Sequence, residues 1–415
     1  MSDGRQDVSG PSFRTLAILF GAMYFLQGVS EPTAGLVAQP SKALLKSWGK
    51  DAAEISAFAA VLALPWSLKP IYGLLSDFLP IFGSRRRSYL MLTSALATLG
   101  FASLCVSPPS SGAVPWLLAA LLLPTVSVAF NDVVVDALMV EEGQPRGITG
   151  RLQSIQWTAI YASQLLTGVV GGWISGSQRF FLGYAICGAA AFAMFVLAAT
   201  VVRDPPRAPR PRGTWRESWP AVRQSALTLL CVASFLFLWS FNPFSDTVQY
   251  VYLTEVLGLS EEFYGFLLTL QAVGSIVACL AYTIYCRRVS LGTLLHLSIV
   301  MGIASTVCFM LLQGERSAIA VFLCFGFSYM TAMLVQLDLA ARVCPPVVAG
   351  TVFACLMSVS NLGQSSSTAV GGALYESWLE LLGATAAFHQ LVGVGALCTA
   401  GCWLLVPFIR RTAHR

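Results

Sequence analysis

Long apolar stretches separated by short polar breaks run through almost the whole chain. Each stretch approaches or exceeds the roughly 20 residues that an α-helix needs to cross a bilayer core about 30 Å thick. Helices satisfy their own backbone amides there, and the sequence lacks the alternating ten-residue segments of a β-barrel. We therefore expect an all-α membrane protein with twelve transmembrane helices. The predicted spans are 13–38, 53–75, 87–107, 114–138, 149–175, 179–202, 224–250, 260–286, 291–313, 317–340, 347–375 and 384–408.

A Pro- and Arg-rich segment, RDPPRAPRPRGTWRESWP, lies between the sixth and seventh predicted spans. Its composition is typical of a solvated linker. A shift of 200 residues aligns PRGITGRLQSIQWTAIYASQ with PPVVAGTVFACLMSVSNLGQ, which favours duplication of spans five and eleven. We expect two pseudo-symmetric six-helix bundles, residues 1–202 and 224–415, joined by a cytoplasmic linker at 203–223.

The distribution of basic residues predicts how the chain sits in the membrane. Of the 25 Lys and Arg residues, nineteen fall on the side of both termini, and Lys69 lies within a span. Basic loops stay in the cytoplasm, so we expect both termini there, in a cell (inner) membrane. The net charge of +5 is spread over short clusters, which argues against nucleic acid as a partner. The opposite side carries five cations, Lys42, Lys46, Lys50, Arg179 and Arg316.

The composition excludes most other functions. A chain of 415 residues that is 56% hydrophobic and 11% charged carries more apolar surface than one soluble core of its size buries. Its eleven cysteines include no metal-ligand spacing, so we expect neither a metal nor a cofactor. The sequence lacks H-E-x-x-H, G-x-S-x-G and nucleotide-binding P-loop motifs, which leaves a membrane enzyme or sensor as the least favoured alternative. We expect a monomer that binds a small solute within the lipid bilayer.

The loop after span two, GLLSDFLPIFGSRRRSYL, combines a glycine, an acid and three arginines at one span end. It resembles the G-x-x-x-D-x-x-G-R-R signature of the major facilitator superfamily, with a stretched spacing. In that superfamily the loop latches the inward gate, whereas the alternative is a plain positive-inside loop. The resemblance implies gating roles for Gly73, which would allow close helix approach, and for Asp77, Arg85, Arg86 and Arg87.

Three blocks in order extend the resemblance along most of the chain. They are PWSLKPIYGLLSDFLPIFGSRRRSYL, NDVVVDALMVE followed by GRLQSIQW, and LAARVCP followed by TVFACLMSVSN. These blocks are similar to the folate-biopterin transporter family, which implies proton-coupled movement of folates or related pterins. One departure concerns Ala34, which stands where plant and cyanobacterial members carry an Arg. The NDVVVDA stretch is also similar to the QD-x-x-x-DA pattern of muropeptide permeases, so a muropeptide is the alternative solute.

Five acidic residues lie within predicted spans one, four, seven and ten, the spans that line the cavity in this superfamily. A carboxylate inside the membrane costs several kcal/mol unless it faces water or a partner. Asp132 and Asp136 are one helical turn apart, and their repulsion favours protonation of one of them. We expect proton coupling by Glu31, Asp132, Asp136 and Asp246. Because these acids lack matching cations in the sequence pattern, a neutral or cationic solute also fits.

The remaining charged residues within the predicted spans each allow two interpretations of their role. Lys69 is the one clear cation inside a span, and we expect it to take part in gating, with snorkelling to the interface as the alternative. Asp338 and Arg342, one turn apart near the end of span ten, are also expected to gate. The acids of spans four and ten could instead cap helices or pair with Arg146, Arg151 or Arg342.

Amide and indole side chains recur on the same faces of the predicted cavity helices. Such groups hydrogen-bond to and stack on flat heteroaromatic rings, which suits a pterin. Polar packing between helices is the competing interpretation for Asn361 and Gln364. The predicted substrate-binding residues are Gln27, Glu31, Gln153, Gln156, Trp157, Trp239, Asn242, Asp246, Gln249, Asn361 and Gln364.

Overall fold

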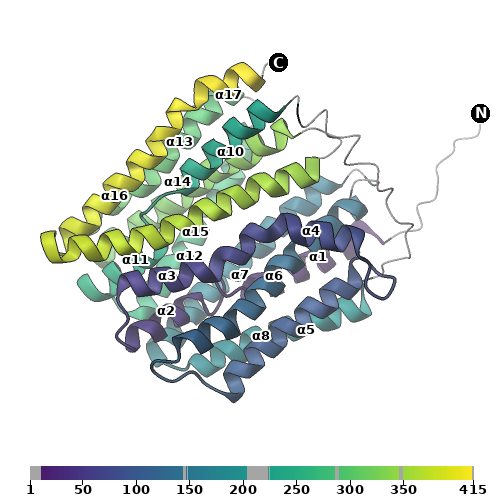
Figure 1. The fold of residues 1–415 in the computed structure, drawn as a ribbon, viewed down its shortest axis with the longest axis horizontal. Coiled ribbons are helices and arrows are strands. Elements are labelled where there is room, and N and C mark those ends of the chain that lie inside the picture. The colour runs from purple at the N-terminus through teal and green to yellow at the C-terminus, as the bar shows by residue number, and fades with distance from the viewer. Residues whose placement is uncertain are drawn as a thin grey trace, which may run out of the picture.

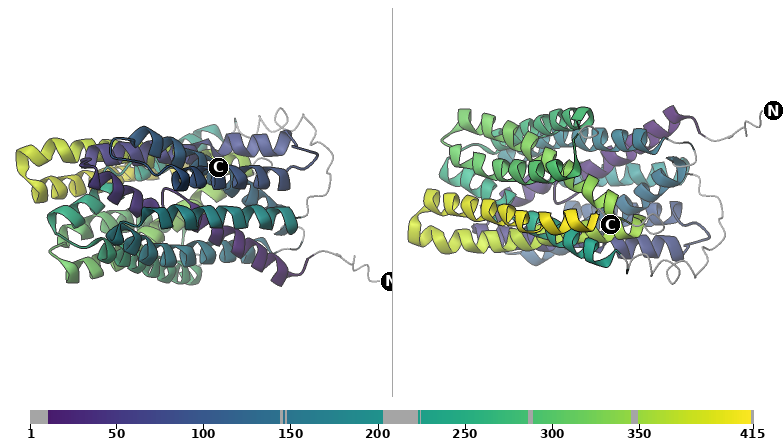
Figure 2. Two further views of the ribbon diagram at one scale, coloured as in Figure 1. Left: turned by 90° about the horizontal axis from the view of Figure 1, so that it is seen from below. Right: turned by 90° about the horizontal axis from the view of Figure 1, so that it is seen from above.

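The computed structural model describes residues 11–143, 146, 148–202, 223, 225–285, 289–344 and 349–413. Within those ranges the chain forms an elongated bundle of helices, shown from three directions in Figures 1 and 2. Helix α1 begins and helix α17 ends at the same end of the bundle, which we call the termini end. The opposite end carries the short helices α2 and α11, and we call it the far end.

The described residues of the first half form eight helices and one short 3-10 segment. Neighbouring helices of this half pack against each other as a group, with α5 against α6 and α8, and α1 against α7 and α8. The elements are α1 (Phe13–Ser30), α2 (Ala38–Ser47), α3 (Ala52–Ala63), the 3-10 segment Leu64–Leu68, α4 (Lys69–Phe78), α5 (Arg87–Val106), α6 (Val114–Gly143), α7 (Thr149–Ser177) and α8 (Phe180–Thr200).

The second half repeats this organisation, with α13 against α14 and α16, and α10 against α15 and α16. Its elements are α10 (Ala226–Ser240), α11 (Asp246–Val251), the π-helical turn Tyr252–Val256, α12 (Glu261–Tyr285), α13 (Leu291–Val307), the 3-10 segment Cys308–Leu311, α14 (Glu315–Val343), α15 (Ala349–Leu382), α16 (Ala384–Gly401), the 3-10 segment Cys402–Leu404 and α17 (Val406–Ala413). The linker predicted at 203–223 lies outside the described residues apart from Arg223, and the domain boundaries stay a prediction.

Nine helical segments of the described chain are long and apolar enough to cross a membrane. The other three predicted spans correspond to α7, α10 and α15. Helix α10 is apolar but has only 15 residues, whereas α7 and α15 have 29 and 34 residues and carry more polar side chains. These twelve segments make up the two six-helix bundles that the sequence predicts.

Two predicted spans are interrupted in the structure, so the expectation of one continuous helix in each is wrong. Span one was predicted to reach residue 38, but α1 ends at Ser30 because Glu31 precedes Pro32. Proline disfavours a helical residue before it, and Glu31 is extended, with φ −73° and ψ 120°. Span seven breaks in the same way before Pro243, and the chain resumes as α11 at Asp246.

The two halves meet along two seams, α7 against α12 and α3 with α4 against α15. The seams are equivalent under exchange of the halves, as expected for duplicated bundles. Glycines permit the α7–α12 contact. A Cβ atom on Gly172 would lie 2.9 Å from the Cα atom of Gly265 and 3.0 Å from the Glu261 carbonyl oxygen. Backbone therefore packs directly on backbone across this seam.

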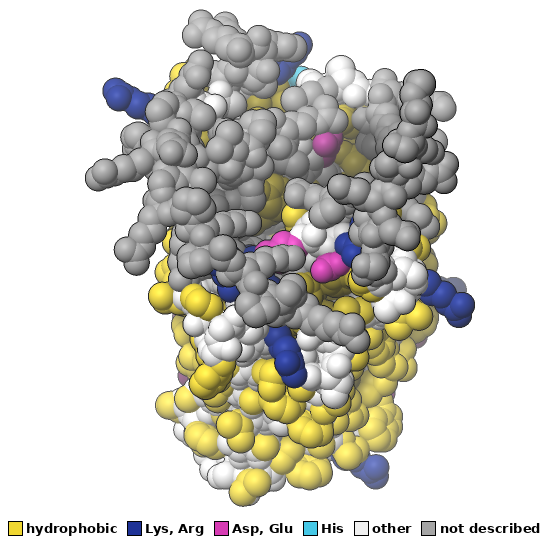
Figure 3. All heavy atoms as spheres, turned by 90° about the vertical axis from the view of Figure 1, so that its right-hand side faces the viewer, with side chains coloured by type: hydrophobic (Ala, Val, Ile, Leu, Met, Phe, Trp, Pro, Cys, Tyr) yellow, Lys and Arg dark blue, Asp and Glu magenta, His cyan; other side chains and the backbone are white. Residues whose placement is uncertain are grey.

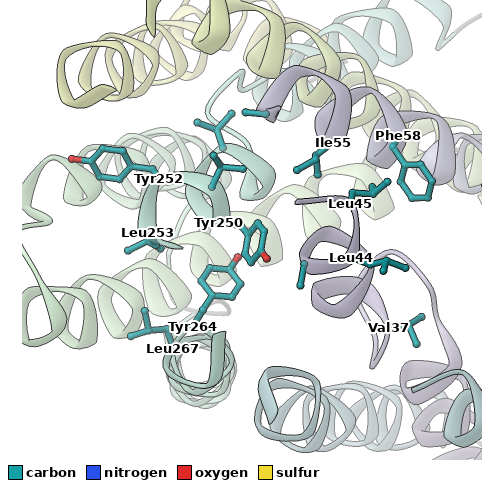
Figure 4. Packing of buried hydrophobic residues seen from close by; sticks show 14 of the residues in the cluster. Val37, Leu44, Leu45, Ile55, Phe58, Tyr250, Tyr252, Leu253, Tyr264 and Leu267 are labelled. Carbon is teal, nitrogen blue, oxygen red and sulfur yellow. The ribbon is translucent and has the colours of Figure 1, made fainter. Parts of the chain in front are cut away.

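The buried apolar residues show where the halves join. At the far end one hydrophobic cluster contains residues of both halves, and Figure 4 shows part of it. Elsewhere, the largest clusters of the described chain each belong to a single half. The halves are therefore packed together mainly at the far end, and a smaller cluster of Tyr161 with Ala272, Ala278 and Met330 also joins them. The labelled far-end residues are Val37, Leu44, Leu45, Ile55 and Phe58 of the first half and Tyr250, Tyr252, Leu253, Tyr264 and Leu267 of the second.

Candidate functional site

A cavity of about 2040 Å³ lies between the two halves. Its lining extends from Lys42 and Asp246 near the far end to Arg86 and Glu141 near the termini end. Figure 3 looks onto the termini end, where Asp and Glu side chains show near the middle of the face and Lys and Arg side chains show both there and at its edges. Hydrophobic side chains cover much of the visible lower part, which suits contact with lipid.

An ion pair in the first half is the central feature of the cavity wall. Lys69, at the start of α4, donates to Oδ2 of Asp132 on α6 at 2.7 Å. The amide of Gln27 on α1 donates to the other oxygen, Oδ1, at 2.8 Å. The Lys69 ammonium also lies 4.7 Å from the centre of the Trp66 ring. Lys69 is therefore held by a carboxylate and an aromatic face.

Asp136 lies one turn further along α6 and has different partners. The Tyr24 hydroxyl donates to its Oδ1 at 2.5 Å, and the Gln156 amide donates to the same atom at 3.0 Å. Among the described residues no donor reaches Oδ2 of Asp136, and no cation forms an ion pair with this carboxylate. Asp132, Asp136 and Lys69 together place two carboxylates and one ammonium on one wall of the cavity.

Glu31 is buried at the end of α1, and its carboxylate closes the turn that follows the helix. Its Oε1 accepts from Thr33 N at 2.9 Å, from Thr33 Oγ1 at 2.6 Å and from Trp66 Nε1 at 3.3 Å. Its Oε2 accepts from Ala34 N. Glu31 lies four residues after Gln27, but the two do not share a helical face because α1 ends at Ser30. Glu31 still lines the cavity.

Two lysines of α2 bridge the halves at the far end. Lys42 pairs with Asp246 at the start of α11 at 2.5 Å, and Lys46 pairs with Glu261 at the start of α12 at 2.8 Å. The Tyr250 hydroxyl also donates to Glu261, at 2.8 Å. These carboxylates lie in the first turns of their helices, where the helix dipole also favours negative charge. The ion pairs thus add to the hydrophobic contacts that close the far end.

The expectation that the acids within the spans lack matching cations is wrong for two of them. Asp132 pairs with Lys69, which therefore does not extend freely to the interface as a snorkelling side chain would. Asp246 pairs with Lys42, which the sequence pattern had placed in a solvated loop. Arg146, one of the alternative partners, pairs instead with Glu142 near the end of α6, at 2.8 Å.

On the second half, some of the predicted binding amides are used by the protein itself. Asn242 Nδ2 donates to Thr306 Oγ1 at 2.8 Å, while its Oδ1 accepts from Phe244 N, so it stabilises the break between α10 and α11. Asn361 Nδ2 donates to the carbonyl oxygen of Trp66 at 2.9 Å, across the α4–α15 seam. Within a helix that carbonyl would accept from residue 70, but Pro70 has no N–H. These contacts agree with the packing interpretation for Asn361.

Arg86 and Arg87, two of the residues predicted to gate, make contacts within the first half. Arg86 is buried and donates to Ser76 Oγ and Glu141 Oε1, both at 2.9 Å, which joins the start of α5 to α4 and α6. Arg87 donates to the carbonyl oxygen of Ala199 on α8. A Cβ on Gly73 would meet Val133 at an ordinary 3.7 Å, so close helix approach does not explain this glycine here.

Sequence reasoning missed three residues of this site. Tyr24 contacts Asp136, Trp66 contacts both Glu31 and Lys69, and Lys42 pairs with Asp246. Spacing offered a signal for two of them, since Tyr24 precedes Gln27, and Trp66 precedes Lys69, by one helical turn. The side chains of Asp77, Gln153 and Arg342 lie outside the described residues. Among the predicted residues, those that line the cavity are Gln27, Glu31, Lys69, Gly73, Arg86, Asp132, Asp136, Gln156, Trp157, Trp239, Asn242, Asp246, Gln249, Asp338, Asn361 and Gln364.

Two helical bundles surround a central cavity, and solved structures of multi-pass membrane transporters share this fold. A bacterial homologue of the human lysosomal transporter Spinster, in an inward-facing and unoccupied conformation, superposes with a TM-score of 0.71 at 13% identity, covering 98% of both chains. A peptide transporter POT in complex with sulfate gives 0.71 at 14% identity over 97% of both chains. The predicted fold class, two six-helix bundles of the major facilitator type, is confirmed.

The sequence relatives then identify the family. The chain belongs to the BT1 family, whose model matches residues 27–409. It is 31% identical to the folate-biopterin transporter of Synechocystis sp. over 394 residues, covering 89% of this chain and 76% of the relative. It is 24% identical to folate transporter 2 of Plasmodium falciparum, covering 72% of this chain and 68% of that protein. The protein is therefore a transporter of a small molecule and not an enzyme.

Proposed function

We propose that this protein moves folate- or pterin-like solutes across the membrane by alternating access, coupled to protons. The proposal is carried by one observation, the cavity between the halves whose wall holds Asp132, Asp136 and Lys69. The far end is closed by a shared hydrophobic cluster and two ion pairs, while the halves separate toward the termini end. Opening the far end while closing the termini end would expose the same wall to the other side.

Proton coupling is assigned to the carboxylates of the cavity, with Asp136 as the first candidate. Its Oδ2 accepts no hydrogen bond from the described residues, so a proton or a solute N–H can bind there. Asp132 supports it by holding Lys69 close, because the ammonium offsets part of the charge of both carboxylates. Glu31 and Asp246 remain candidates, although the first is surrounded by donors and the second pairs with Lys42.

The proposed orientation places the termini end in the cytoplasm. It is supported by the excess of Lys and Arg in the tails and loops of that side. The structure then corresponds to a state that is open toward the cytoplasm, in a cell membrane, and we propose that the protein works as a monomer. A muropeptide is the second candidate solute, because NDVVVDA is similar to the QD-x-x-x-DA pattern of muropeptide permeases.

The experiment is uptake of labelled folate and biopterin into vesicles that contain the purified protein and carry an imposed pH gradient. We expect the gradient to raise the accumulated amount well above equilibration. Equal uptake with and without the gradient would reject coupling. A thermal-shift screen with folates, pterins and anhydro-muropeptides identifies the solute, because only a true ligand stabilises the folded state by mass action.

A further inference from the structure

We infer that the cavity selects its solute by charge, taking a flat, uncharged heterocycle that donates hydrogen bonds and disfavouring the multiply anionic form of the same ring system. This inference rests on the proposed function, and it narrows the substrate from folate- or pterin-like solutes to the uncharged ones among them. It follows from the charges, the hydrogen bonds and the aromatic surfaces of the cavity wall.

The cations of the wall are already engaged. Among the described residues, the cations that line the cavity are Lys42, Lys69 and Arg86. Each forms an ion pair with a carboxylate of the protein, at 2.5, 2.7 and 2.9 Å. An anionic solute would therefore have to displace one of these carboxylates, and the displaced group would be left in the cavity without its partner.

The carboxylates of the wall exceed these cations. Asp136 and Glu31 line the cavity, and neither forms an ion pair with a described cation. Both carboxylates are held by neutral donors only. A solute carboxylate that enters this space meets like charge at short range, and the low dielectric of the site strengthens the repulsion.

On the first half, Asp136 and Gln27 offer acceptor atoms without a donor, whereas on the second half Trp239 Nε1 and Gln336 Nε2 are donors without a partner. Oδ2 of Asp136 accepts no hydrogen bond from a described residue, since Tyr24 and Gln156 both donate to Oδ1. Gln27 is only 8% exposed, and its Oε1 has no hydrogen-bond partner, while its Nε2 donates to Asp132. A buried acceptor without a donor costs free energy that a solute N–H would recover. The wall therefore fits a ligand edge that carries N–H groups.

Aromatic side chains on both sides of the cavity fit the faces of a flat ring. In the first half Trp157, next to Gln156, stacks with Tyr161 at a ring distance of 6.1 Å. In the second half Tyr329 packs against Trp239 at 5.7 Å and stacks on Phe325 at 5.4 Å. All five rings line the cavity. A neutral pterin ring, with its amino and ring N–H groups, has both the donors and the flat faces that this arrangement requires.

Three probes of one ring system and rising charge test the inference with the full-length purified protein. Biopterin carries no carboxylate, pteroic acid carries one, and folic acid carries two. We expect the dissociation constant at neutral pH to rise along this series, by at least tenfold between biopterin and folic acid. Isothermal titration calorimetry measures the constants, and competition against labelled biopterin uptake provides a second readout.

A pair of isosteric variants assigns the effect to the cavity. Asp136→Asn removes one negative charge from the wall, and we expect it to narrow the preference for biopterin over folic acid at least threefold. Glu315→Gln removes an exposed carboxylate outside the cavity lining and should leave the preference unchanged. The wild-type series decides the inference even if Asp136→Asn does not fold.

The outcomes separate this inference from the proposed function. Folic acid binding as tightly as biopterin, or more tightly, overturns charge selection but leaves a folate or pterin carrier in place. If Asp136→Asn and Glu315→Gln reduce the preference for biopterin over folic acid equally, charge selection by the cavity is also overturned, because the effect would then not come from the cavity. Failure of all three probes to bind removes the proposed function and the inference with it.

Discussion

Lys69 and Asp132 illustrate how a charged group is kept inside a membrane protein. The Lys69 ammonium forms an ion pair with the Asp132 carboxylate at 2.7 Å and also lies over the Trp66 ring. The Gln27 amide donates a hydrogen bond to the second oxygen of that carboxylate. Both side chains are largely buried, at 20% and 10% exposure. At such a site, loss of one partner leaves the other charge without compensation, which costs more than the pair contributes.

A double-mutant cycle tests this at the level of single residues. Lys69→Met should lower the free energy of unfolding by about 3–5 kcal/mol, because Asp132 and Asp136 then face each other without a cation. Lys69→Met combined with Asp132→Asn should recover a large part of that loss. Thermal unfolding of the purified variants in detergent measures the loss of stability in Lys69→Met and its recovery in the double variant. Losses that simply add would show that the two side chains do not interact.

At the scale of elements, helix α2 connects the two halves at the far end. Lys42 and Lys46 lie one turn apart on the same face of this short helix, and their partners Asp246 and Glu261 begin two helices of the other half. Helix α2 also contributes Leu44 and Leu45 to the hydrophobic cluster there. Under the proposed alternating access, opening of the far end would break both the ion pairs and the hydrophobic contacts of α2.

We predict that Lys42→Ala shifts the protein toward the state that is open at the far end. Labelling of an introduced cysteine at Ala34, in the cavity lining, by a reagent added from the far side should become several-fold faster. Lys50→Ala is the matched control, because Lys50 pairs at 2.7 Å with Glu54 of its own half. Equal acceleration in both variants, or none in Lys42→Ala, would show that the Lys42–Asp246 pair does not hold the far end closed.

The glycine contact of α7 with α12 gives a second prediction at this scale. Gly172→Ala should destabilise the protein by about 1–3 kcal/mol, since a methyl group would press on backbone atoms of the opposite half that cannot give way. Gly393→Ala, in α16, is the control, because a Cβ there meets no atom within 4 Å. Unfolding temperatures compare the two. A loss no larger in Gly172→Ala than in the control would contradict the tight seam.

The sequence predicted the elements well because long apolar runs have few alternatives in a bilayer. It also pointed to Asp132 and Asp136, since both lie one turn apart within such a run. The pattern could not predict that Lys42 reaches Asp246 or that Asn361 reaches Trp66, because these partners are more than 200 residues apart. Contacts across the halves depend on the packing of bundles, which local periodicity does not specify.

At the scale of the whole molecule, the arrangement of cores determines what the transporter can do. One cluster of the far end belongs to both halves, and the main clusters nearer the termini end belong to one half each. Under the proposed alternating access, each half would keep its own core while the shared far-end contacts open. The ion pair of Lys69 with Asp132, and Asp136 beside it, lie within the first half and move with it as a unit.

The most direct measurement compares two modes of transport in vesicles that contain either the wild-type protein or the Asp136→Asn variant. Exchange of labelled for unlabelled biopterin needs only alternating access, whereas accumulation against a gradient also needs a proton site. We predict that Asp136→Asn keeps exchange within about threefold of wild type and loses most of the accumulation driven by an imposed pH gradient. Accumulation at the wild-type level in this variant would contradict the account.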